Sequence, residues 1–274
     1  MKKIICLLVA LLMALSVFAA CTPKEDNRKV LRVAMECDYA PYNWTQTTDE
    51  NGAVPIKDTN EFAYGYDVMM AKLLADKLDY RLEIVKRAWE GLTPALLAGE
   101  IDCVIAGESM TSERMENVDF TEPYYYASIV VLVKNDSEFA DAKGLADLKG
   151  ASATSQTSTV WYDKFLPQIP EVKKGASSGK VPPMVESLKA GKFDVLVVDM
   201  PAAMAITASN SDLKILDFSE TDDGFKETQE DVNIGVSVKK GNAELVEELN
   251  SVLKTLTVED FERMMKEAIE LSAE

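Results

Sequence analysis

The chain has 274 residues, with 29 lysines and arginines, 46 aspartates and glutamates, no histidine and a net charge of −17. An acidic balance of this size excludes a nucleic-acid partner held through its phosphates, because that binding depends on clustered cations. The absence of histidine excludes Ser–His–Asp and Cys–His triads, and no cysteine pair has metal-ligand spacing, so neither a metal nor a cofactor is expected.

The first residues have the pattern of a secretory leader. Two lysines precede a mostly apolar run at 4–18, and two alanines lie directly before Cys21. The run is too short for a comfortable transmembrane span. Cys21 predicts lipoprotein processing, in which residues 1–20 are removed and a lipid is attached to the thiol. The alternative is an ordinary secretory leader with an incidental cysteine. Without residues 1–20 the chain keeps 27 basic and 46 acidic residues, a net charge of −19.

After a polar tether at 21–29, apolar runs alternate between the spacings of strands and helices. The spacing predicts strands at 30–37, 81–87 and 101–107, and helices at 65–78 and 90–99, with Gly99 as a helix stop. Alternating strands and helices predict parallel α/β layers. Cys37 and Cys103 fall in the strand-like runs, and we interpret them as buried free thiols, with a disulfide as the alternative.

A short sequence unit occurs twice. "AGEIDCVIAG" begins at Ala98 and "AGKFDVLVVD" at Ala190, and each follows a helix-like segment and places an aspartate before an apolar run. Ligands bind at the carboxyl ends of strands in open α/β sheets. The first unit ends on Gly107 and the second on Asp199, so the repeat predicts two lobes that present binding groups to a shared cleft.

Two extended runs, at 126–136 and 230–242, have the character of connections between such lobes, and a helical segment with one apolar face follows the second run. The predicted fold class is α/β, with a ligand cleft between two lobes joined by two crossing strands. The predicted organisation is a signal peptide at 1–20, a lipid-anchored tether at 21–29, lobe 1 at 30–130 and 233–274, and lobe 2 at 131–232.

Arg114 follows a run of glycine, serine and threonine, "AGESMTSER". Small residues leave backbone N–H groups open to a ligand, and arginine binds a carboxylate through two parallel hydrogen bonds. Thr111 is a good N-cap for a short helix that begins here. The stretch predicts one half of a carboxylate site. The alternative is a surface arginine paired with Glu116 or Asp119.

The chain resembles the bacterial extracellular solute-binding proteins of family 3, the polar amino-acid receptors of ABC importers. The markers are "LRVAMECDYAPYNW", "GYDVMMAKLLADKL", "WEGLTPALLAGEID", "MTSERMENVDFTEPYY", "LADLKG", "LKAGKFDVLVVDMPAA" and "IGVSVKKGN", in this order across nearly the whole chain. The resemblance implies a two-lobed type II periplasmic binding protein. It also implies a monomeric, lipid-anchored receptor at the outer face of the cell membrane, which delivers an amino acid to an ABC transporter permease.

The resemblance also implies roles for individual residues. Arg114 would take the ligand α-carboxylate, with hydrogen bonds from Gly107 and Ser109 in lobe 1. Ser158 and Thr159 would add donors from lobe 2, although Ser158 replaces a usual glycine. Asp199 would take the α-ammonium; its alternative is an N-cap for the helix that follows. Tyr39, Trp89 and Glu36 complete the predicted site: the two aromatic residues enclose the aliphatic part of the ligand and Glu36 faces the end of its side chain.

A carboxylate at Glu36 favours a polar or cationic ligand over an acidic one. We place Glu108 outside the site, as an electrostatic contributor only, because neighbouring residues on a strand point to opposite faces and Gly107 facing the ligand would turn Glu108 away. Two other functions stay open. One is an enzyme of the cyclohexadienyl dehydratase type, with Glu36 or Glu108 as its acid, and the other is a ligand-sensing receptor component. We prefer the hypothesis that the chain is a binding protein without enzymatic activity.

Overall fold

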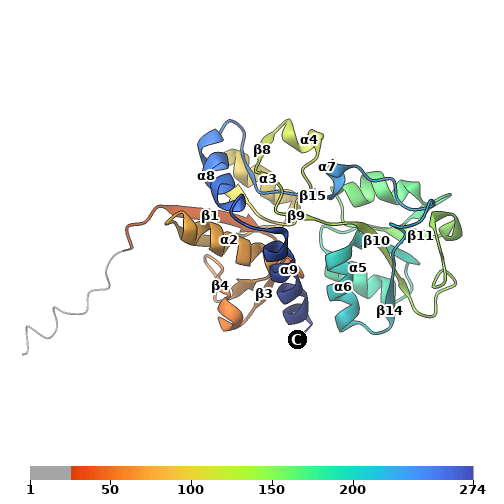
Figure 1. Ribbon diagram of the computed structural model, residues 1–274. Coiled ribbons are helices and arrows are strands. Elements are labelled where there is room, and N and C mark those ends of the chain that lie inside the picture. The colour runs from red at the N-terminus through yellow and green to blue at the C-terminus, as the bar shows by residue number, and fades with distance from the viewer. Residues whose placement is uncertain (1–25, 274) are drawn as a thin grey trace, which may run out of the picture.

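The structure, a computed structural model, describes residues 26–273 and has two lobes, each built around a five-stranded sheet (Figure 1). The sheet of lobe 1 has the order β6 (Arg81–Lys86), β1 (Val30–Met35), β7 (Cys103–Val104), β16 (Ser237–Lys239) and β8 (Val118–Phe120). The sheet of lobe 2 has the order β12 (Lys173–Lys174), β11 (Ser152–Thr154), β13 (Val195–Asp199), β10 (Ile129–Lys134) and β14 (Leu213–Leu216). The predicted leader, Cys21 and the tether up to residue 25 lie outside the described residues.

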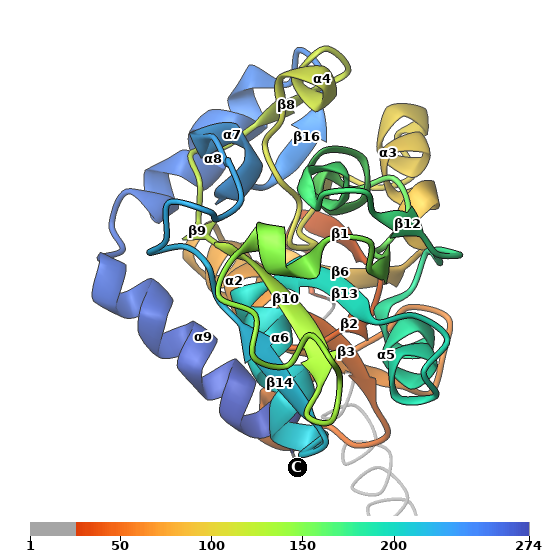
Figure 2. The same cartoon turned by 90° about the vertical axis from the view of Figure 1, so that its right-hand side faces the viewer.

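Helices pack against both sheets. Lobe 1 carries α2 (Tyr66–Lys77), α3 (Trp89–Ala98), α4 (Ser112–Met115), α8 (Ala243–Leu253) and α9 (Val258–Ser272). Lobe 2 carries the short helices η3 (Leu145–Leu148), η4 (Trp161–Phe165) and η5 (Leu166–Gln168), together with α5 (Val181–Lys189), α6 (Met200–Ser209) and α7 (Gln229–Val232). In Figure 2, where lobe 2 faces the viewer, the paired strands β10 and β14 run beside α6.

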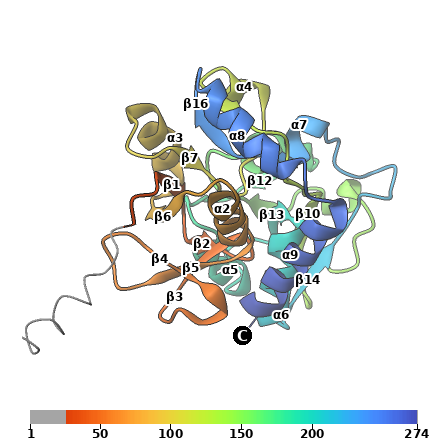
Figure 3. The same ribbon diagram turned by 60° about the vertical axis from the view of Figure 1, so that its left-hand side comes forward.

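A small sheet extends lobe 1. It consists of β2 (Asp38–Tyr39), β3 (Asn43–Gln46), β5 (Phe62–Tyr64) and β4 (Val54–Pro55), with the short helix η2 (Glu50–Gly52) before β4. Figure 3 shows it next to α2, against which β3 and β5 pack. Its first strand, β2, also contacts α5 of lobe 2, so this sheet reaches the boundary between the lobes.

The strands and helices predicted in the first hundred residues are present. The runs at 30–37 and 81–87 form β1 and β6, which pair in parallel, and the helices predicted at 65–78 and 90–99 are α2 and α3. Gly99 ends α3 with a φ of 75°, a left-handed conformation that glycine adopts without strain. The run at 101–107 is a strand only at Cys103–Val104.

The two copies of the repeated unit have the same structural role. Asp102 donates its backbone N–H to the Arg32 carbonyl and accepts the Arg32 N–H on its carboxylate, at 2.9 and 2.8 Å. Asp194 exchanges the same two bonds with Ser152, both at 2.8 Å. In each lobe the aspartate directly precedes a strand and joins it to the neighbouring parallel strand, which helps to set their register.

Two short strands connect the lobes. β9 (Tyr125–Tyr126) leads from lobe 1 into β10, and β15 (Asn233–Ile234) leads back toward β16; the two pair with each other in antiparallel fashion. The predicted lobe boundary between residues 130 and 131 falls inside β10, which pairs with β13 and β14 of the sheet of lobe 2. A paired two-strand connection of this kind is a hinge geometry.

The C-terminal helix contacts both lobes. α9 packs against α2 of lobe 1 and against α6 of lobe 2, and Figure 1 shows it along the division between them. It begins with a capping box in which Thr257 and Asp260 exchange hydrogen bonds, and it buries Met264, Met265 and Ala268.

Cys37 and Cys103 are buried and unpaired, which confirms the free-thiol interpretation. Burial raises the pKa of the Cys37 thiol to about 12, so this group stays un-ionised. Between residues 26 and 273, no helix has the length and apolar character needed to cross a membrane.

Candidate functional site

The predicted site residues lie at the boundary between the lobes, at the ends of strands and the starts of helices. Lobe 1 contributes Glu36 after β1, Tyr39 on β2, Trp89 at the start of α3, Gly107 and Ser109 after β7, and Arg114 on α4. Lobe 2 contributes Ser158 and Thr159 after β11 and Asp199 at the end of β13. Six of the nine donate or accept a hydrogen bond across the boundary: Glu36, Tyr39, Trp89, Arg114, Ser158 and Asp199.

Arg114 lies at this boundary, on a short helix whose N-cap is Thr111, as predicted. Its Nη1 donates to the Ser109 carbonyl at 2.8 Å and its Nη2 to the Ser158 carbonyl of lobe 2 at 3.3 Å. The guanidinium lies over the Trp89 ring, 5.2 Å from its centroid. Asp119, one proposed surface partner, pairs with Lys240 instead. These contacts favour a role at the boundary over a surface ion pair.

Glu108 lies beside Arg114, so the side chain does not turn away as strand alternation predicted, whereas the electrostatic contribution that we allowed for it agrees with this contact. Its Oε1 lies 3.5 Å from Arg114 Nε, and its Oε2 accepts a hydrogen bond from Ser237 Oγ at 2.7 Å. The alternation rule applies only to extended backbone, and Gly107 has a φ of 61°. The left-handed glycine turns the chain, so the buried Glu108 carboxylate faces the guanidinium and partly balances its charge.

Asp199 is fully buried and serves two purposes. Its Oδ1 accepts the Ala202 N–H at 2.9 Å and so caps α6, while its carboxylate also accepts hydrogen bonds from the hydroxyls of Tyr39 and Tyr42 in lobe 1. Burial raises its pKa to about 6, against the lowering effect of these hydrogen bonds. The alternative of an N-cap is confirmed, and the predicted contact of Asp199 with a ligand ammonium stays a prediction.

The rings of Tyr39 and Tyr42 stack, with centroids 5.1 Å apart, and Gly107 lies against both. A Cβ on Gly107 would lie 3.3 Å from each ring, so only glycine fits this left-handed position comfortably. The Gly107 N–H donates to Tyr124 Oη at 3.3 Å. In this conformation its donor is therefore directed into lobe 1.

Glu36 is 5% exposed and accepts from the side-chain amide of Gln156 in lobe 2, at 3.2 and 3.3 Å to its two oxygens. Burial raises the pKa of Glu36 to about 8; Asp38 and Glu90 add to this, whereas Lys180 opposes it. Lys180 itself is paired with Asp38. The carboxylate therefore has a hydrogen-bond donor and no salt bridge among the described residues.

At Ser158 and Thr159 the chain of lobe 2 presents the Ser158 carbonyl to lobe 1. The Ser158 carbonyl accepts from Trp89 Nε1 at 3.2 Å as well as from Arg114, and the Thr159 hydroxyl donates to the Gln156 carbonyl at 2.7 Å. Ser158 has a φ of 58°, a conformation that favours glycine. Glycine would adopt this backbone conformation with less strain than Ser158 does.

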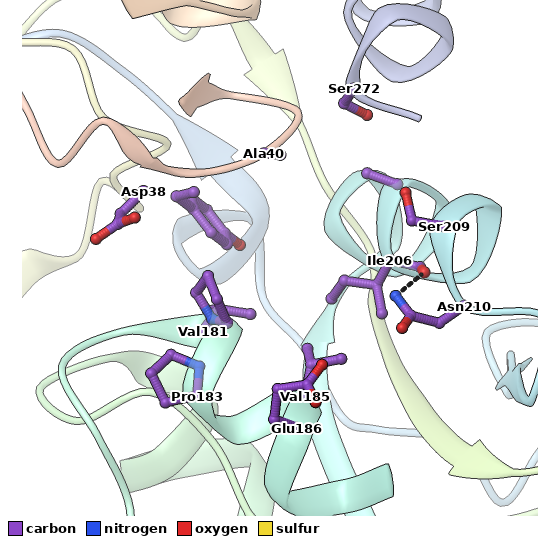
Figure 4. Close-up of a pocket in the computed structure, with 13 residues that line it drawn as sticks. Asp38, Ala40, Val181, Pro183, Val185, Glu186, Ile206, Ser209, Asn210 and Ser272 are labelled. Carbon is purple, nitrogen blue, oxygen red and sulfur yellow. Dashed lines mark hydrogen bonds between the residues drawn. The ribbon is translucent and has the colours of Figure 1, made fainter. Parts of the chain in front are cut away.

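The cavities along the boundary differ in whether polar or apolar residues line them. Two of them, of about 490 and 200 Å³, share Arg114 and Ser158 in their walls; the larger also contains Lys164, Asp163, Glu230 and Asp231. A third, of about 530 Å³, is mostly apolar and lies between Asp38–Ala40 of lobe 1 and α5 and α6 of lobe 2 (Figure 4). Of the predicted site residues only Tyr39 lines the third cavity.

The boundary residues that were not predicted include Tyr42, Gln156 and Trp161. Gln156 follows β11 directly, so the strand-end rule that selected Asp199 contains a signal for it. Tyr42 and Trp161 lie on a loop and a short helix, and only the tertiary structure brings them to Asp199 and Tyr39.

Two α/β lobes, a paired-strand hinge and a charged, aromatic boundary define a two-lobed binding protein that closes on a small ligand. The chain belongs to the bacterial extracellular solute-binding proteins of family 3, whose family model matches residues 31–267.

Individual relatives agree with this assignment. The arginine-binding extracellular protein ArtP of Bacillus subtilis is 26% identical over 93% of both chains. A Streptococcus pneumoniae amino acid ABC transporter substrate-binding protein, solved with bound L-arginine, is 29% identical, with a TM-score of 0.73 over 88% of this chain and 94% of the other. The ancestral amino acid-binding protein AncCDT-1, a precursor of cyclohexadienyl dehydratase, is 27% identical, with a TM-score of 0.69 over 88% and 95%.

Replacing Glu36 by Gln is expected to change how stability depends on pH. The pKa of Glu36 is about 8 in the folded protein against 4.5 for an ordinary glutamate, so the stability that this group contributes is present below about pH 4.5 and is lost as the pH rises through about 8. The neutral variant should match the ligand-free wild type at about pH 5 and exceed its stability at about pH 8.5, measured by urea denaturation.

The matched control is Glu138→Gln, at an exposed glutamate on lobe 2. Its difference from the wild type should stay constant between the two pH values. An equally constant difference for Glu36→Gln would contradict the raised pKa.

Proposed function

We propose that the protein captures a polar or cationic L-amino acid between its lobes and delivers it to the permease of an ABC importer. One observation carries the proposal: Glu36 and Asp199 are buried at the lobe boundary, and neither forms a salt bridge within the described residues. A buried carboxylate without a cation is unfavourable. The α-ammonium would supply the cation that Asp199 lacks, and a polar or cationic side chain would supply a further donor to Glu36.

The α-carboxylate of the same ligand would bind Arg114. Its guanidinium already spans the boundary, but its two acceptors there are backbone carbonyls, which carry no net charge. A carboxylate would form stronger, charge-assisted hydrogen bonds in their place. A zwitterion bridging Arg114 and Asp199 would join the lobes, and this differential contact would favour the closed state.

The ligand would compete with contacts within the protein. Tyr39 donates to Asp199 and Gln156 donates to Glu36 across the same boundary. An ammonium at Asp199 would displace or share the tyrosine hydroxyl, and a cation at Glu36 would lower the raised pKa of that group. Binding of a cationic amino acid near neutral pH would therefore release a proton.

The experiment that tests the proposal is a ligand screen on the intact extracytoplasmic chain. The protein is unfolded, stripped of co-purified ligand and refolded, and its melting temperature is measured with each common amino acid. A ligand at about 100-fold over its Kd should stabilise by about 2.7 kcal/mol. Turnover of prephenate or arogenate would instead establish the enzyme, and the absence of any binding would overturn the proposal.

Arg114→Ala is expected to weaken binding of the best ligand by about 10²- to 10⁴-fold. Removing one partner of a buried ion pair costs roughly 3–5 kcal/mol, and about 1.4 kcal/mol corresponds to a tenfold change in Kd. Titration calorimetry measures the change. Arg263→Ala, at an exposed arginine on α9, is the control and should bind as the wild type does. An Arg114→Ala variant within a few-fold of the wild type would show that the carboxylate binds elsewhere.

Glu36→Gln is expected to reorder ligand preference. The wild type should bind lysine, arginine, histidine or glutamine more tightly than glutamate or aspartate, because a second carboxylate would place like charges close together in a poorly screened cleft. The variant should lose preference for cations over glutamine. Competition among glutamate, glutamine and lysine measures both rankings. Tightest binding of glutamate by the wild type, or the same ranking for both proteins, would refute a specificity role for Glu36.

The lipid anchor is a separate proposal that depends on the pattern before Cys21. Cys21→Ser should give an exported protein without lipid that leaves the membrane fraction, measured by fractionation and by mass spectrometry of the N-terminus. Wild-type protein that is soluble and unacylated would contradict the anchor without affecting the binding proposal.

A further inference from the structure

Trp161 occupies the lobe boundary without any role in the site as described so far. It is the first residue of η4, two positions after Thr159, and its side chain is 5% exposed. Its indole lies 6.1 Å from the Tyr39 ring of lobe 1, centroid to centroid, with the planes tilted by 42°. The indole is thus placed between the two lobes, beside the tyrosine that donates to Asp199.

The indole nitrogen of Trp161 has no hydrogen-bond acceptor. Nε1 is buried, and no oxygen of residues 26–273 lies within bonding distance and geometry. Buried N–H groups in folded proteins are almost always paired, so an unpaired one requires an explanation. The other tryptophan at the boundary is paired: Trp89 Nε1 donates to the Ser158 carbonyl. The contrast shows that a boundary indole can find an acceptor in this fold.

We infer that Trp161 Nε1 donates a hydrogen bond to an oxygen of the bound ligand. The inference rests on the proposed function, and it adds a ligand-contact residue that was not among the predicted site residues. A ligand acceptor would satisfy the unpaired donor, so the indole would contribute to binding without contributing to the stability of the ligand-free protein.

The α-carboxylate is the acceptor that fits best. Trp161 lies against Tyr39, and Tyr39 bonds Asp199, the residue proposed to hold the α-ammonium. η4 also packs against β13, which ends on Asp199. An amino acid carries its carboxylate on the same carbon as its ammonium, so the carboxylate lies at this end of the ligand, whereas Glu36 and Gln156 face the side-chain end.

The test is Trp161→Phe, which keeps an aromatic ring against Tyr39 and removes the N–H. Affinity for the tightest-binding amino acid from the screen is measured by calorimetry. We expect binding to weaken by about 10-fold, with the ligand-free melting temperature unchanged or raised because an unpaired donor has been removed. Trp44→Phe is the matched control, since the Trp44 ring packs on Tyr64 within lobe 1, and its affinity should be that of the wild type.

A second measurement separates lost hydrogen bonding from altered packing. The chain has three tryptophans, so the indole N–H region of a nitrogen-15 spectrum has three signals, which the Trp161→Phe and Trp44→Phe variants assign. Saturating ligand should shift the Trp161 signal downfield, as a new acceptor requires, while the Trp44 signal stays in place. An unmoved Trp161 signal, or wild-type affinity in Trp161→Phe, overturns the inference alone. Failure of the wild type to bind any amino acid overturns the proposed function and the inference together.

Discussion

The boundary between the lobes buries two carboxylates, Glu36 and Asp199, and provides hydrogen-bond donors for both but a salt bridge for neither. Burial disfavours their charged forms and raises the pKa values to about 8 and about 6, against the lowering effect of the hydrogen bonds that both accept. Closure of the lobes is therefore linked to the supply of positive charge. Protons can supply part of this charge, and in the proposed binding mode a ligand with two cationic groups would supply the rest.

Arg114 differs from these carboxylates, because a residue of the protein already balances part of its charge. Glu108 lies 3.5 Å from its Nε, the Trp89 ring lies beneath the guanidinium, and backbone carbonyls from both lobes accept its N–H groups. A side chain held by this many contacts has little rotamer freedom left to lose when a carboxylate arrives, which favours affinity. Glu108, which we placed outside the site from the sequence, thus helps to hold Arg114 in place.

The spacing of apolar residues predicted the strands and helices that position the site. Prediction from the sequence failed where the backbone departs from regular strand or helix geometry. Apolar spacing predicted β1, β6, α2 and α3, and the repeated aspartate-containing unit pointed to Asp199 at a strand end. Glu108 was misplaced because strand alternation was applied across Gly107, whose left-handed φ reverses the direction of the next side chain. The bond from Gln156 to Glu36 and the contact of Trp161 with Tyr39 depend on how the two lobes meet, and no spacing along one segment contains that information.

Because α9 contacts both lobes, it constrains how they can move relative to each other. The two hinge strands alone would permit rotation about several axes, but a long helix that packs on α2 and also touches α6 restricts the directions in which lobe 2 can swing. Opening must either slide the α6 surface along α9 or separate the two helices and expose their apolar side chains to water. Residues on this helix pair can therefore set the balance between open and closed states, and through it the apparent affinity, without touching the ligand. Substitutions at the contact between α6 and α9 could therefore change the affinity during evolution and leave the ligand specificity unchanged.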